Sequence, residues 1–155
     1  MKGNPEVIKS LVSLLAAQAS ANMQYRLDWR VVNHFGAKGS AHSIHKLGTR
    51  AHKFQKILAD RILDLGGDTS HDVAPVAEQS TLTDVFKNEA KMETNLIALG
   101  EAAIALAVTK NDEATAEKLR HIEERDEKNL IWVETQLDLI GGMGEGVYIA
   151  SHLKK

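Results

Sequence analysis

The chain has 155 residues, of which 43% are hydrophobic and 26% charged, values typical of one soluble globular domain that spans residues 1–155. Nineteen basic against 21 acidic residues exclude a domain that binds nucleic acid through bulk positive charge, and the lack of cysteine excludes disulfides, thiolate zinc sites and iron–sulfur clusters. The start carries no apolar segment of signal-peptide type, and no run approaches the ~18 uninterrupted apolar residues that span a bilayer. We therefore expect a cytoplasmic protein without a membrane partner.

The first half of the chain predicts two long helices. Residues 4–6, Asn-Pro-Glu, are typical of a helix start, because an Asn cap precedes a proline at the first helical position and an acid in the first turn. No helix breaker follows until Gly36. A second helix is predicted from near Ser40 to Leu65, and the glycine pair 66–67 ends it.

The second half predicts a loop followed by three more helices. Residues 68–80 show no helical periodicity and are predicted to be a loop. Thr81 and Asp84 form a capping pair that begins a helix ending at about Lys110. A fourth helix, capped by residues 111–112, is predicted to end at glycines 141–142, and a short fifth helix covers 145–152.

The lengths of the links predict the topology. The links near 36–39 and 110–112 are short, so the first helix should be antiparallel to the second, and the third to the fourth. The middle link of about 14 residues reaches ~45 Å when extended, enough to traverse helices of roughly 26–30 residues. We therefore predict an all-α four-helix bundle with a long crossover between helices 2 and 3, which run parallel, and a short fifth helix.

This organisation resembles ferritin-like cage subunits, and several segments resemble bacterioferritins in particular. These segments are residues 1–8, 22–25, 61–63, 132–140 and 143–148, so the resemblance covers almost the whole chain. It implies dimers formed across helices 1 and 2, and an iron-storing cage of 24 subunits. The cage would be a homo-oligomer or a hetero-oligomer with a catalytic bacterioferritin subunit, served by an electron-donor protein.

The resemblance also implies a di-iron ferroxidase site, and here the chain departs from the family. Bacterioferritins resemble other carboxylate di-iron bundles, with a Glu on helices 1 and 3 and a Glu-x-x-His motif on helices 2 and 4. The matching positions in this sequence are Gln18, Ala51, Phe54, Glu93, Asp126 and Asn129. Only Glu93 and Asp126 are carboxylates, and no histidine remains, so we expect the di-iron chemistry to be lost. Either a hydrogen-bonded polar layer that includes Tyr25, or a residual single-metal site on Glu93 and Asp126, is the expected replacement.

A haem b site is the second feature that the resemblance implies. His42, His45 and His52 share one face of helix 2, and the position that holds the family's haem-ligating methionine is His52. Imidazole is a strong axial ligand of haem iron, and Met23 on helix 1 is the second candidate. Arg26, Lys53 and Arg50 are candidates for contacts with the haem propionates. The alternative is that these side chains form a solvated surface or pack in the dimer interface.

Three functions remain open at the level of sequence. The first is a storage cage subunit that builds the shell, alone or beside a catalytic subunit. The second is a haem-bearing electron-transfer subunit that helps to release iron. The third is a ferroxidase with a displaced site made of Glu89, Glu93 and His121, although acids one turn apart are common on solvated helices.

Overall fold

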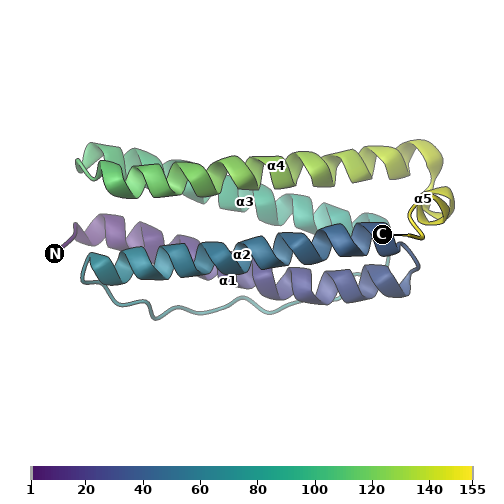
Figure 1. Ribbon diagram of the computed structural model, residues 1–155, viewed down its shortest axis with the longest axis horizontal. Helices are drawn as coiled ribbons and strands as arrows, with labels where there is room; N and C mark the ends of the chain where they lie inside the picture. Colours follow the sequence, from purple (N-terminus) through teal and green to yellow (C-terminus); the bar gives the residue numbers. More distant parts are fainter. Residues whose placement is uncertain (1, 155) are drawn as a thin grey trace.

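The computed structural model describes residues 2–154, which form five α-helices (Figure 1). They are α1 (Pro5–His34), α2 (Lys38–Asp64), α3 (Leu82–Thr109), α4 (Glu113–Met143) and α5 (Glu145–Ser151). The described residues contain no strand. In Figure 1 the pair α1–α2 lies against the pair α3–α4, with α5 turned across one end. The predicted all-α bundle with a short fifth helix is confirmed.

The crossover between α2 and α3 runs the length of the bundle, along the side formed by α1 and α2 (Figure 1). It is fixed to α1 by two side chains. The Ser20 hydroxyl accepts a hydrogen bond from the amide of Ala74 at 2.9 Å, and the Gln24 amide bonds both the N–H and the C=O of Ala77. The crossover carries the chain back to the end of the bundle at which α2 begins. Helices α2 and α3 therefore run parallel, as the length of the loop predicted.

Most helix ends lie where the sequence placed them. The Asn4 side chain accepts hydrogen bonds from two amides of the first turn of α1, and Thr81 accepts one from Asp84 N at 3.1 Å. The end of α4 was predicted wrongly: the helix continues through residues 141 and 142 to Met143 and ends where Gly144 adopts φ +81°. A glycine inside a helix costs only about 1 kcal/mol, so glycines 141 and 142 do not by themselves end the helix. The helix ends at Gly144, because a positive φ cannot continue it.

The short helix α5 closes one end of the bundle through buried polar contacts. The Tyr148 hydroxyl is completely buried and bonds Ser40 Oγ at 2.6 Å and Gln136 Oε1 at 2.7 Å. Glu145 accepts two hydrogen bonds from Thr83 in the first turn of α3. These contacts join α5 to α2, α3 and α4, so the tail is part of the folded unit.

Helix α3 is the one described helix long and apolar enough to cross a membrane by length and composition. In the bundle it packs between α1 and α4, and it carries the buried acids Glu89 and Glu93. These features identify it as a core helix of the bundle, and its acids lie at the centre of the candidate site.

Candidate metal and cofactor sites

Four of the six positions matched to the di-iron site meet in the core, together with Tyr25. All five side chains are at most 3% exposed. Gln18 Nε2 donates to Asp126 Oδ2 at 3.0 Å. Glu93 Oε1 accepts two hydrogen bonds, from the Tyr25 hydroxyl at 2.5 Å and from Asn129 Nδ2 at 3.3 Å. The side chains thus form a hydrogen-bonded layer that joins α1, α3 and α4.

The two acids of this layer share a proton. Burial, the neighbouring charge of Glu93 and a hydrogen bond to it raise the pKa of Asp126 to about 9. Burial also raises the pKa of Glu93, although hydrogen bonds from Tyr25, Asp126 and Asn129 oppose that shift. At pH 7 Asp126 therefore keeps its proton, which it donates to Glu93. Glu93 Oε1 accepts both hydrogen bonds from Tyr25 and Asn129, whereas Glu93 Oε2 accepts no N–H or O–H from any other described residue.

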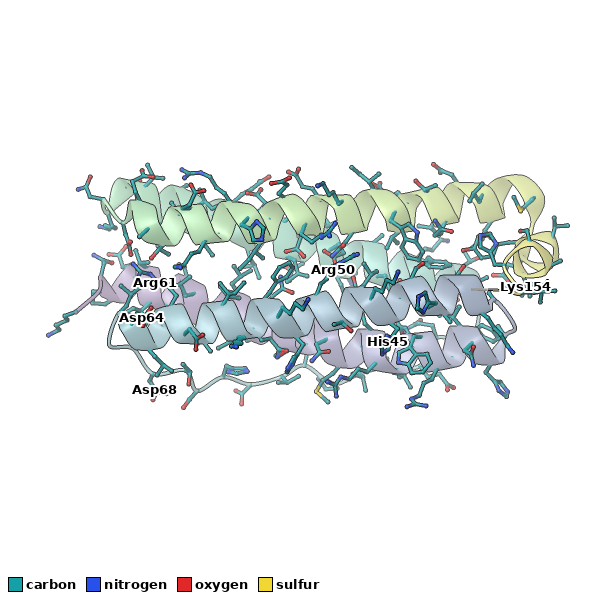
Figure 2. All side chains as sticks on the ribbon, in the orientation of Figure 1. His45, Arg50, Arg61, Asp64, Asp68 and Lys154 are labelled. Carbon is teal, nitrogen blue, oxygen red and sulfur yellow. The ribbon has the colours of Figure 1, made fainter. Side chains whose placement is uncertain are left out.

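The two remaining positions matched to the di-iron site hold apolar side chains. Ala51 and Phe54 on α2 are buried among the apolar residues of the core and offer no atom that ligates a metal. Beside them, the guanidinium of Arg50 approaches Asn129, with 3.5 Å between Nη1 and Oδ1. Figure 2 shows Arg50 in the gap between α2 and α4. A fixed positive charge at the edge of the layer repels metal cations, which is the reverse of what a di-iron site needs.

A second buried acid pair, Asp28 and Glu89, lies next to this layer. Burial is the largest cause that raises the pKa of both groups, and the pKa of Glu89 is held well above its usual range by Asp28 and Glu93 as well. No N–H or O–H donor within residues 2–154 bonds either oxygen of Glu89. The hydrogen bond between the two acids is therefore carried by the Glu89 proton, while Gln24 Nε2 donates to Asp28 Oδ1 at 2.8 Å.

The displaced site predicted from Glu89, Glu93 and His121 is not assembled. The two glutamates are buried in the core, which corrects the expectation of a solvated acidic face. His121 is exposed and lines a hollow between α2 and α4 beside Phe54. Its imidazole therefore belongs to another part of the molecule. The acid that accompanies Glu89 instead is Asp28, a residue that no pattern in the sequence singles out.

A third carboxylate group lies outside the core. Glu101 of α3 and Glu123 and Glu127 of α4 bring one carboxylate oxygen each within 4.8 Å of one another. The spacing of the two α4 residues placed them on one face, but the sequence does not show that Glu101 faces them. Partial burial, together with the neighbouring carboxyl groups of Glu101 and Glu127, raises the pKa of Glu123.

Only two of the five predicted haem residues, His52 and Arg26, line a surface hollow of about 450 Å³ between α1 and α2. His45 and His52 of α2 and Arg26 of α1 line it, together with Asn22, Trp29, Arg30, Gly48 and Thr49. Met23 is 48% exposed and lies one turn before Arg26, outside the lining. Lys53 and Arg50 line hollows on the α4 side of α2, so the structure separates them from His52.

Aromatic and cationic side chains shape this hollow. The rings of Trp29 and His45 meet edge to face with their centroids 5.0 Å apart, and the guanidinium of Arg30 lies 4.8 Å from the centre of the Trp29 ring. Imidazoles that ligate iron and guanidiniums that bind carboxylates are the donor types that a haem with propionate groups requires. The residues present therefore fit the group.

The comparisons with known proteins agree with this architecture. A family model described as a ferritin-like domain matches residues 8–143. Bacterioferritin from Streptomyces coelicolor is 30% identical over 100% of this chain and 93% of its own length, and bacterioferritin from Mycobacterium avium is 30% identical over 97% and 95%. A bacterial ferritin from Pseudomonas aeruginosa is 26% identical over 99% and 100%. The chain therefore belongs to the ferritin-like family and, within it, to the bacterioferritins.

Proposed function

We propose that this chain is a bacterioferritin cage subunit that serves iron storage without a working di-iron centre of its own. The family relationship supports the storage role, because bacterioferritins are iron-storage cage subunits. The inference that the di-iron centre is degenerate rests on one observation. The matched positions hold a proton-sharing polar layer and two apolar side chains. Two irons ~3.5–4 Å apart need bridging carboxylates and terminal imidazoles, and this layer supplies neither set.

Iron oxidation by the homomer tests the degenerate centre. The purified protein, stripped of metal, is mixed with two Fe(II) per subunit in aerated buffer, and oxidation is followed by absorbance. We expect a rate close to that of buffer alone, with a bacterioferritin that carries the full ligand set as the positive control. Rapid oxidation of two Fe(II) per subunit would contradict the proposal. Tight binding of one Fe(II) per subunit without oxidation would instead indicate a single-metal site, and loss of that binding in Glu93→Gln would assign it to Glu93 and Asp126.

Rebuilding the centre provides a second test. The combined variant Gln18→Glu, Ala51→Glu, Phe54→His, Asp126→Glu and Asn129→His restores every ligand type of the family pattern. We expect this variant to regain oxidation only if Arg50 is also changed to a neutral residue, because its guanidinium borders the layer. Each single reversion should remain inactive, since it leaves the other ligand positions unfilled. Activity from a single reversion would refute this explanation.

A haem-bearing electron-transfer role is the second candidate, and the α1–α2 hollow is the observation that favours it. If α1 and α2 form the dimer interface, His52 of each subunit supplies one axial ligand to a haem on the twofold axis. Arg26 would bind a propionate, and Met23 is the alternative axial donor. A bound haem would supply a one-electron carrier; the residues of this chain hold and orient it.

Spectroscopy of the haem distinguishes these ligands. The protein is expressed with a haem precursor, and the Soret band of wild type is compared with His52→Ala and Met23→Leu. Paired imidazoles should give a low-spin spectrum and a lower reduction potential than paired thioethers, because methionine ligation raises the potential. Unchanged haem content and ligation in His52→Ala excludes His52, and the Met23 variant then shows whether sulfur is the ligand.

The missing centre also motivates a mixed cage. A subunit that cannot oxidise iron still builds the shell, so we propose that it co-assembles in the cytoplasm with a catalytic bacterioferritin subunit. Co-expression of both subunits followed by native mass spectrometry tests this. Cages that contain both chains support it, whereas strict sorting into two homomeric populations refutes it.

A further inference from the structure

Six basic side chains line the groove between α2 and α4. Three lie on α2 (Lys46, Arg50 and Lys53) and three on α4 (His121, Arg125 and Lys128). In both helices the three residues are separated by four and then three positions, which places them on one helix face. The structure brings the two faces opposite each other, because Arg50, Arg125 and Lys128 line both of two neighbouring hollows. The groove is thus a basic strip shared by two helices.

Acidic partners compensate little of this charge. Lys128 lies 3.4 Å from Glu124 on an exposed surface, where such pairs contribute little. The other five side chains take part in none of the ion pairs found within residues 2–154. Burial and the facing charge of Arg125 both lower the pKa of the Arg50 guanidinium. Like charges held together across a groove favour the binding of an anion between them.

The shape of the groove limits the size of that anion. Its two hollows have volumes of about 280 Å³ and 320 Å³. At ~30 Å³ per water molecule, each holds roughly ten waters, which suits a small hydrated anion. Polar groups other than cations, Ser43 and Asn129, line the first hollow. The chain as a whole carries a net charge of -2, which disfavours a nucleic acid as the ligand.

We infer that the α2–α4 groove is a binding site for phosphate. Arg50 and Arg125 face each other at its centre, and guanidinium groups bind phosphate oxygens through paired charge-assisted hydrogen bonds. Lys46 and Lys53 add charge at the two ends of the groove, and Lys128 lines both hollows. Because Arg50 also bonds Asn129, the site borders the buried polar layer. Of the residues predicted to hold metal or haem it uses only Lys53 and Arg50, which line hollows away from His52. Phosphate binding can therefore be tested independently of the proposed cage function.

Equilibrium dialysis with radiolabelled inorganic phosphate tests this site. The assembled protein is freed of iron by reduction and chelation and dialysed at pH 7 in chloride buffer of constant ionic strength. We expect saturable binding of at least one phosphate per subunit. The double variant Lys53→Gln/Arg125→Gln should weaken binding at least tenfold, and Lys46→Gln/Lys128→Gln should weaken it by a smaller factor. All four side chains reach the surface, and circular dichroism with the assembled mass verifies that each variant folds.

The matched control is Lys87→Gln/Lys91→Gln, which removes the same number of positive charges from the exposed face of α3. It should bind phosphate like wild type. Equal weakening by the control and the groove variants would show diffuse charge attraction and overturn the proposal, as would the absence of saturable binding. A parallel dialysis with ATP as competitor identifies the source of the phosphate group. Displacement of the label shows that nucleotides reach the groove, and its absence assigns the groove to free phosphate.

Discussion

Replacing Asp126 by asparagine should stabilise the protein, and the gain should grow with pH. The protonated Asp126 accepts a hydrogen bond from Gln18 and donates one to Glu93. An asparagine offers the same pair of groups, since its carbonyl oxygen accepts and its amide donates. The substitution therefore preserves both hydrogen bonds while removing a group whose ionisation the core opposes.

The size of the effect follows from the pKa of Asp126, which rises from 3.8 to about 9 on folding. Below pH 3.8 both states are protonated and there is no penalty. As the pH rises toward 9, the unfolded state loses a proton that the folded state keeps, and the free energy of unfolding falls by ~1.4 kcal/mol per pH unit. At pH 7 this amounts to at most about 4.5 kcal/mol, which Asp126→Asn recovers.

Urea unfolding followed by circular dichroism measures this gain. Wild type and variant are compared at pH 5.5 and pH 8.0, in EDTA and at one protein concentration, because assembly also changes apparent stability. The advantage of the variant should increase by about 3 kcal/mol between these values. Asp138→Asn, at an exposed position of the same helix, is the control and should show no such trend. A variant that is destabilised equally at both values would refute the shared-proton description.

Two further predictions concern the end of the bundle closed by α5. Tyr148→Phe removes the buried hydroxyl that bonds Ser40 and Gln136, and it should lower the free energy of unfolding by about 1–3 kcal/mol, measured by thermal or urea unfolding; an unchanged stability would show that water replaces the hydroxyl. Gly39→Ala places a Cβ atom 2.6 Å from the carbonyl oxygen of Lys154, so the C-terminal segment should detach and limited proteolysis there should accelerate. Proteolysis at the wild-type rate would mean that the segment shifts without detaching.

The main features of the fold could be predicted from the sequence because they depend on local signals. Capping residues, glycines after apolar stripes and one long link determine the number of helices and their order. The end of α4 was the exception, since residues 141 and 142 are glycines that remain helical and only the conformation of Gly144 marks the end. Backbone conformation at a glycine depends on the packing around it, which composition does not reveal.

The candidate sites were harder to predict, because they depend on which helix face meets which neighbour. His52 and Lys53 are adjacent in sequence, but a helix turns by about 100° per residue, so they face different grooves. Asp28 is buried on α1, where Gln24 joins it to the crossover, and the path of a loop cannot be read from its residues. By contrast, the layer of Gln18, Glu93 and Asp126 could be predicted through the family pattern.

The pairing of helices through short links has a consequence for how the chain folds. The helices joined by short links, α1 with α2 and α3 with α4, form two hairpins of local contacts, which assemble faster than distant segments. The bonds from Gln18 to Asp126 and from Tyr25 to Glu93 cross from one hairpin to the other. Docking of the hairpins therefore removes these acids from water and takes up protons. Alkaline pH should therefore slow folding at this docking step. Amide hydrogen exchange should show that the two hairpins separate from each other before either hairpin unfolds.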